Sequence, residues 1–238
     1  MFLSDIWNGL TNPLKGILRK GKVNRIIKEE WWDAGDRNID TLVIHHSAEE
    51  DSQTRDWSEI DRYHRSFRIN WDSVASPQAI GNERIDIRKC IQYKKSWYLV
   101  SEMTDFYERC KQPFASVVHG YFDKDYFQSA WSQIAYHLGI EEIDGVQTIQ
   151  YGRDLKVEGG HTALETMNMR SIGLCCLGDF QKNYMSQDKW DFLVKVVKEV
   201  VAKYPKINII GHNQVEGATT SCPGAHLDIS KLILEVLK

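Results

Sequence analysis

The 238-residue sequence lacks any long uninterrupted apolar run and carries little net charge. No stretch approaches the roughly 20 apolar residues that a membrane-spanning helix needs, so no such helix is expected. A net charge of −3 provides no overall attraction to nucleic acid, and we expect no nucleic-acid partner. The N-terminus lacks the charged-then-apolar order of a secretory signal, so we expect synthesis in a cytoplasm.

The cysteines are poorly arranged for disulfide bonds. The five cysteines are odd in number, and Cys175 and Cys176 are adjacent inside an apolar run. A reducing site of synthesis is therefore the simpler interpretation. Hydrophobic residues make up 42% of the chain, which is enough for a folded core of ordinary composition.

Residues 1–24 form a segment distinct from the rest of the chain. Apolar residues recur along residues 2–18 close to one helical stripe, and basic residues follow at positions 15–22. One interpretation is a terminal arm that docks on the domain. The other is an amphipathic helix that lies on a membrane surface through residues 2–22.

The remaining chain predicts strands that alternate with helices. Strands are expected at residues 39–47, 132–140, 146–152, 171–178 and 207–212, the second and third joined by an Asp144-Gly145 turn. Helices are expected at residues 56–67, 95–111, after a Ser186 cap, and from about residue 228. The alternation predicts one α/β domain over residues 25–238, with a segment of no clean period at 69–130.

Three side chains that bind metals share one local setting, because each follows an apolar strand or lies in the loop after it. They are His45 after LVI, His212 after INIIG and Cys222 in TTSCPG. Strand ends in α/β sheets open onto the crevice where sites are built. Two imidazoles and one thiolate leave a fourth position for water, as in catalytic zinc sites. The alternative for each histidine is a packed, hydrogen-bonded residue.

Three further residues are candidates for the same crevice. Tyr136 lies in the predicted strand 132–140, which we expect to neighbour the His45 strand, and its phenol could donate to an oxyanion. Its alternative is a core tyrosine. Thr220 could present its hydroxyl to the reaction or cap the loop backbone. His161 lies between glycines and a threonine, in a loop that we expect to be mobile and exposed.

The ordered motifs resemble the zinc N-acetylmuramoyl-L-alanine amidases, the family of amidase-type bacteriophage endolysins and animal peptidoglycan recognition proteins. The matching segments are RIIKEEWWDAG (25–35), LVIHHSA (42–48), IDRYHRSF (60–67), IAYHLGI (134–140), GRD (152–154), GGHT (159–162), NMRSIGLCCLGDF (168–180) and GHNQVEGATTSCPG (211–224). The resemblance covers roughly residues 25–68 and 131–238. Residues 69–130 are then an insertion, which we interpret as a cap, a lid or a binding element.

The resemblance implies an α/β fold with a central mixed β-sheet flanked by α-helices and a groove for the glycan–peptide junction. It implies one Zn²⁺ per chain, held by His45, His212 and Cys222. Because side chains alternate along a strand, His46 then points away from the metal and orients a loop through a ring N–H.

The resemblance also implies roles for residues around the metal. It places Tyr136 in the position of the catalytic tyrosine, and Thr220 matches a threonine of the catalytic recognition proteins. We also expect four residues to contact the substrate: His46, Arg153, His161 and Asn168.

The activity implied is hydrolysis of the amide between N-acetylmuramic acid and L-alanine in bacterial peptidoglycan, by a monomeric phage endolysin. Such a protein is made in the host cytoplasm and acts on the wall after release. Three alternatives stay open: a peptidoglycan receptor without hydrolysis, a phage amidase that also restrains a polymerase, and a recycling amidase for soluble anhydro-muropeptides.

Overall fold

The structure is a computed structural model, and it describes most of the chain outside two segments. The described residues are 25–49, 51, 56–69, 78–80, 83–85, 97–99, 127–128 and 131–238. The predicted arm at residues 1–24 and most of the predicted insertion at 69–130 lie outside these ranges. Among the described helices, none is both long and apolar enough to cross a membrane.

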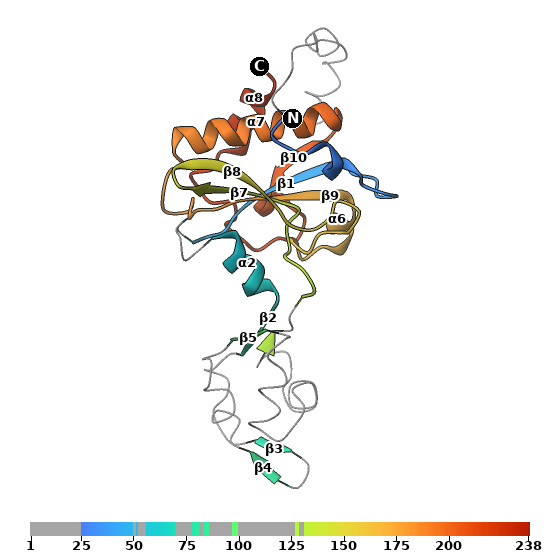
Figure 1. The fold of residues 1–238 in the computed structure, drawn as a ribbon, viewed down its shortest axis with the longest axis vertical. Coiled ribbons are helices and arrows are strands. Elements are labelled where there is room, and N and C mark those ends of the chain that lie inside the picture. The colour runs from blue at the N-terminus through green and yellow to red at the C-terminus, as the bar shows by residue number, and fades with distance from the viewer. Residues whose placement is uncertain are drawn as a thin grey trace.

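A five-stranded mixed sheet forms the centre of the fold (Figure 1). Its strands in spatial order are β10 (Asn208–Gly211), β1 (Thr41–His46), β9 (Ser171–Cys176), β7 (Leu138–Ile143) and β8 (Val146–Tyr151). The first four run parallel to one another, and β8 pairs antiparallel with β7. The expected α/β fold with a central mixed sheet is therefore confirmed.

The helices and the short strands outside this sheet follow the chain in sequence order. They are the 3₁₀ helix η2 (Glu29–Trp32), α2 (Trp57–His64), β2 (Ser66–Ile69), β3 (Gln78–Ile80), β4 (Glu83–Ile85), β5 (Trp97–Leu99), β6 (Phe127–Gln128), α6 (Glu165–Arg170), α7 (Gln187–Lys203), the 3₁₀ helix η6 (His212–Gln214) and α8 (Ile229–Val236). Strands β5, β2 and β6 form a small sheet, and β3 pairs with β4.

The two faces of the central sheet are covered differently, and β1 shows how. Leu42 and Ile44 point into the main core, which is built with the apolar faces of α7 and α8. Val43 points to the opposite face, where Met167 of α6 and Val215 pack against it. Helices α7 and α8 lie on one side of the sheet, and α2 and α6 lie on the other (Figure 1). His45, two residues after Val43, therefore emerges on the α2 and α6 side.

Local sequence signals explain the principal elements. The side chain of Ser186 accepts a hydrogen bond from the Lys189 backbone N–H and caps α7, as predicted. The turn between β7 and β8 places both Asp144 (φ 51°) and Gly145 (φ 77°) in the left-handed region, as a two-residue hairpin turn of type I′ requires. Strand β9 is fully buried and lies third of five in the sheet, as its continuous apolar run predicts.

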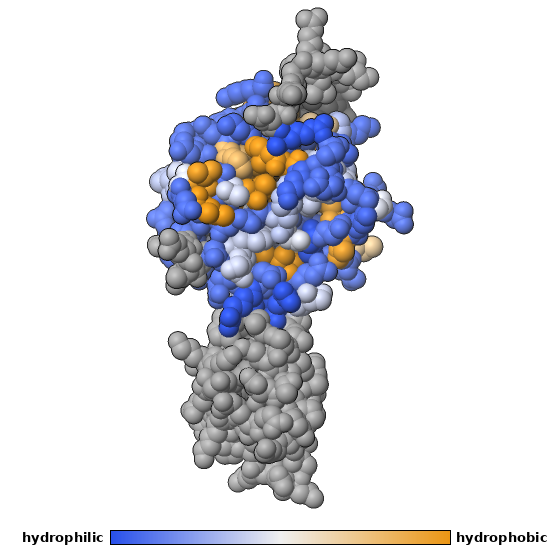
Figure 2. All heavy atoms as spheres, viewed as in Figure 1, coloured by the Kyte–Doolittle hydropathy of each residue, from blue (hydrophilic) through white to orange (hydrophobic). Residues whose placement is uncertain are grey.

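Hydrophilic side chains cover most of the face seen in Figure 2, and apolar side chains gather at the level of α7 and β8. Ile149 of β8 and Phe192 of α7 are among the partly buried side chains that pack against the core.

Two predictions about the strand carrying Tyr136 are wrong. The strand begins at Leu138 rather than at residue 132, and β9 lies between it and β1. The preceding residues are irregular because their carbonyl groups bond to a loop: Tyr136 accepts from the Arg153 N–H and Ala135 from the Gly160 N–H. The predicted helix at 95–111 is also contradicted where it is described, since residues 97–99 form β5.

Candidate metal centre

The three predicted metal ligands lie together in the structure. Their ligand atoms, one each from His45, His212 and Cys222, all lie within 4.8 Å of one another. The parallel pairing of β1 with β10 explains this, because Ile44 is in register with Gly211 and the two histidines are the next residues of their chains. The His45 and His212 rings lie 4.6 Å apart between centroids.

Backbone hydrogen bonds position the loop that carries Cys222. The His46 backbone N–H donates to the Cys222 Sγ over 3.4 Å. The Cys222 carbonyl accepts from the Asn213 N–H over 2.7 Å, which ties the loop to η6. The sulfur is thereby held 3.7 Å from the His45 Nδ1.

The geometry and donor set of this cluster are of the type that binds zinc. Nitrogen and sulfur ligands of a tetrahedral zinc ion, with bonds of about 2.0–2.3 Å, lie about 3.6 Å apart. The 3.7 Å between the His45 Nδ1 and the Cys222 Sγ matches this spacing. Two imidazoles and one sulfur leave the fourth tetrahedral position free for water or substrate.

Burial sets the protonation of these groups in the absence of a metal. It lowers the pKa of His45 well below its ordinary value, with the neighbouring His212 and His46 adding to the shift. Burial also lowers the pKa of His212 and raises that of Cys222 to about 11. The imidazoles are therefore neutral and ready to coordinate, whereas the thiol releases its proton when a metal binds.

Tyr136 lies beside the cluster although it precedes β7, a strand that does not neighbour β1. Its ring centroid is 5.1 Å from that of His45. The ring also packs against the small apolar cluster of Trp57, Ile134 and Cys175. Burial raises the pKa of Tyr136 well above its ordinary value, so the phenol is neutral and can donate a hydrogen bond.

Thr220 hydrogen-bonds to the backbone of the loop that carries Cys222. Its Oγ1 accepts a hydrogen bond from the Cys222 N–H over 3.1 Å. This is the capping arrangement that the sequence left open as the alternative for Thr220. A catalytic role for this hydroxyl stays a prediction.

The predicted exposure of His161 is wrong. The side chain is only 5% exposed, and its Nδ1 lies 3.0 Å from the His45 Nε2. The ring fills space left by two glycines, Gly159 of the same loop and Gly173 of β9. A Cβ at Gly159 or Gly173 would lie 2.3 or 2.4 Å from the ring. The loop is thus packed around the histidine rather than open to solvent.

His46 points to the same side of β1 as Leu42 and Ile44, the side covered by α7 and α8, as strand alternation predicts. It is buried, and its Nδ1 accepts a hydrogen bond from the Phe180 backbone N–H over 3.1 Å. It therefore orients the loop after β9, but with this ring nitrogen as acceptor rather than donor. Contact between His46 and a substrate stays a prediction.

The other two residues predicted to contact substrate are bonded to nearby backbone. Arg153 donates from Nε to the Ile134 carbonyl over 2.6 Å and from Nη1 to the Glu158 carbonyl over 2.8 Å. The buried Asn168 accepts from the His161 and Thr162 N–H groups at 3.1 and 3.0 Å. Both side chains hold the loops of the site, and their substrate contacts stay predictions.

Sequence reasoning missed three residues around the centre. Ser171 lies 3.2 Å from the His161 Nε2, and the His64 ring lies 5.6 Å from the Tyr136 ring. His137 is fully buried and accepts from the Gly173 N–H. One signal was available, because glycine within the apolar strand β9 indicates close approach of another group.

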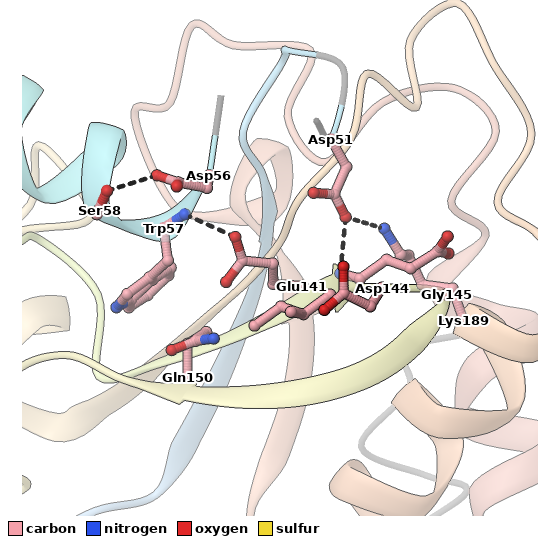
Figure 3. Close-up of a pocket in the computed structure, with 11 residues that line it drawn as sticks. Asp51, Asp56, Trp57, Ser58, Glu141, Asp144, Gly145, Gln150 and Lys189 are labelled. Atoms are coloured by element: carbon pink, nitrogen blue, oxygen red, sulfur yellow. Dashed lines mark hydrogen bonds and ion pairs between the residues drawn. The ribbon is translucent and has the colours of Figure 1, made fainter. Parts of the chain in front are cut away.

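A cavity of about 630 Å³ lies apart from the three ligands, between the start of α2 and the β7–β8 hairpin (Figure 3). Carboxylates predominate in its lining, and Asp51 forms a 2.6 Å ion pair there with Lys189. Glu141 accepts a hydrogen bond from the Trp57 backbone N–H. Trp57 lines this cavity, and its ring lies 6.3 Å from the Tyr136 ring of the candidate centre.

A family model described as N-acetylmuramoyl-L-alanine amidase matches residues 35–225. Because this match spans most of the sequence, the chain belongs to the N-acetylmuramoyl-L-alanine amidase family. No curated protein is significantly similar to it in sequence.

Solved structures of related proteins resemble the chain at low sequence identity. The N-acetylmuramoyl-L-alanine amidase LysC from Clostridium intestinale URNW is 19% identical, with a TM-score of 0.48, 84% of this chain covered and 87% of LysC. Bumblebee PGRP-SA is 20% identical, with a TM-score of 0.43, 86% of this chain covered and 90% of PGRP-SA. The Ph2119 endolysin from Thermus scotoductus MAT2119 bacteriophage Ph2119 is 14% identical, with a TM-score of 0.43, 88% of this chain covered and 92% of the endolysin.

Proposed function

We propose that this chain hydrolyses the amide between N-acetylmuramic acid and L-alanine in bacterial peptidoglycan, with one zinc ion bound by His45, His212 and Cys222. The observation that carries the proposal is the convergence of these three ligand atoms within 4.8 Å in a member of this amidase family. When bound in such a site, zinc supplies a Lewis acid that makes water nucleophilic near neutral pH and polarises an amide carbonyl.

The chain's own residues then stabilise the charge that develops on the substrate. The neutral phenol of Tyr136, whose ring lies 5.1 Å from that of His45, donates a hydrogen bond to the oxyanion formed from the scissile carbonyl. Thr220 accepts from the Cys222 N–H, which leaves its own hydroxyl hydrogen free to donate to the same oxygen. The Asn168 and Arg153 hydrogen bonds keep the surrounding loops in place.

The proposed biological setting is lysis of a bacterial host by a phage endolysin, made in the host cytoplasm and acting on the wall after release. The proposed organisation is an amidase domain at residues 25–238 with an insertion at 69–130, preceded by an arm at 1–24. Membrane contact through residues 2–22 and a monomeric state stay predictions.

Digestion of purified peptidoglycan tests the activity. Mass spectrometry should find free muramic acid carboxyl groups and peptides that begin with L-alanine, and a chelator should abolish both products. Zinc added back should restore them, except in the His45→Ala variant. Binding to peptidoglycan without new amino termini would show a receptor instead. Release only from soluble anhydro-muropeptides would show a recycling amidase.

A further inference from the structure

A line of hydrogen bonds runs from the candidate metal ligand His45 away from the metal position. The His45 Nε2 lies 3.0 Å from the His161 Nδ1, and the His161 Nε2 lies 3.2 Å from the Ser171 Oγ. Ser171 in turn bonds to the backbone carbonyl of Met167 over 2.6 Å. The line therefore links β1 to the last turn of α6 through two buried side chains.

The final carbonyl sets the direction of the two bonds that Ser171 makes. A carbonyl only accepts, so the single hydroxyl hydrogen of Ser171 goes to Met167. The Ser171 oxygen must then accept from the His161 Nε2–H. The His45 Nδ1, 3.7 Å from the Cys222 sulfur, must present a lone pair to bind a metal, so the His45 hydrogen lies on Nε2. The His161 Nδ1, 3.0 Å away, accepts this hydrogen and therefore carries none itself.

Two glycines leave space for the flat ring of His161. Gly159 lies against the Cδ2 and Nε2 of His161, and Gly173 lies against the Cγ, Cδ2 and Nε2 of the same ring. A Cβ at either glycine would clash with these atoms. Asn168 accepts from the His161 backbone N–H and so fixes the loop at the same place. Glycine in the centre of a strand costs stability, which is consistent with a purpose at this point.

We propose that Ser171 and His161 are positioning residues, which hold His45 in the tautomer whose Nδ1 lone pair faces the metal. Ligand histidines commonly donate their second N–H to a carboxylate or a carbonyl. Here the acceptor is a neutral imidazole, so orientation is achieved without adding negative charge to the centre. A less anionic environment leaves the metal a stronger Lewis acid. This inference rests on the zinc site of the proposed function.

A pair of nearly isosteric substitutions tests the role of hydrogen bonding separately from packing. His161→Gln keeps an acceptor for His45 and a donor for Ser171, whereas His161→Met keeps the bulk and loses both. Competition with a chromogenic chelator should show zinc binding weakened about 10- to 100-fold in His161→Met and close to the parent in His161→Gln. The metal-free variants should unfold at similar temperatures. Equal zinc affinity in the two variants would overturn the proposal.

Ring-nitrogen NMR of the metal-free protein separates this inference from the zinc proposal. His45 and His161 should both carry their hydrogen on Nε2, and Ser171→Ala should shift His161 toward the Nδ1–H form. Failure of the parent protein to bind zinc would defeat the proposed function and leave this measurement valid. A parent protein with His161 protonated on Nδ1 would defeat the positioning role, whatever its zinc affinity.

Discussion

Two neighbouring histidines show how strongly position decides the chemistry of a residue. His45 and His46 are chemically identical and both buried, yet they face opposite sides of one strand. The His45 Nδ1 lies 3.7 Å from the Cys222 sulfur, whereas His46 accepts from the Phe180 N–H on the side of the sheet that α7 and α8 cover. The period of two along a strand therefore predicts which ring belongs to the metal centre.

Matched asparagine substitutions should separate the two rings. His45→Asn should abolish stoichiometric zinc binding, because an amide oxygen is a poor replacement for imidazole nitrogen in a site of this kind. His46→Asn keeps an acceptor near the Phe180 N–H and should bind one zinc ion per chain. Metal analysis of the dialysed proteins measures both, and zinc lost only from the His46 variant would reverse the assignment.

Tyr136→Phe should lower turnover about 10²- to 10³-fold, since one donor to the oxyanion is lost. The substitution keeps the ring that packs against Trp57 and Ile134, so fold and zinc content should be unchanged. Rates of peptide release from peptidoglycan at equal zinc occupancy provide the measurement. An unimpaired Tyr136→Phe enzyme would exclude the phenol from catalysis.

At the scale of elements, prediction succeeded where the signal is local. The capped helix α7, the buried strand β9 and the Asp144-Gly145 turn all lie where short patterns place them. Prediction failed before Leu138, because residues there bond to a loop distant in sequence rather than to a strand. An apolar pattern does not show which partner a backbone carbonyl will find.

The β7–β8 turn allows a clean test of local backbone strain. Gly145 has a φ of 77°, and nothing lies within 4 Å of the place a Cβ would take. Gly145→Ala should therefore lower the free energy of unfolding by about 1–2 kcal/mol through its backbone conformation alone. Asp144→Gly, which removes the neighbouring side chain at φ 51°, should not destabilise the protein in this way. Urea unfolding compares the variants, and no loss in Gly145→Ala would refute the argument.

At the scale of the whole molecule, buried neutral histidines link stability to pH. Burial lowers the pKa of His64 to about 4 and that of His137 to about 3. An unfolded chain returns these rings to the ordinary value of 6.5, so below that pH it binds protons that the folded chain does not. The free energy of unfolding therefore falls as the pH falls from 6.5 toward these lower values.

His137→Gln should weaken this dependence. A histidine that binds a proton only in the unfolded chain lowers the free energy of unfolding by about 1.4 kcal/mol for each pH unit below its unfolded pKa. The slope of unfolding free energy against pH, measured with urea in metal-free protein between about pH 6 and pH 4, should be smaller in the variant by that amount. At about pH 7.5 the two slopes should agree. Parallel curves throughout would mean that folded His137 takes up its proton normally.

Local patterns in the chain were sufficient to predict the α/β class, the alternation of faces along β1 and three candidate ligands at strand ends or in the loop that follows. These depend on neighbours within a few residues, which a sequence displays directly. The placement of β9 between β1 and β7, the burial of His161 and its bonds to His45 and Ser171 required the folded structure. Each joins groups far apart in sequence, and packing in three dimensions alone decides which of them come into contact.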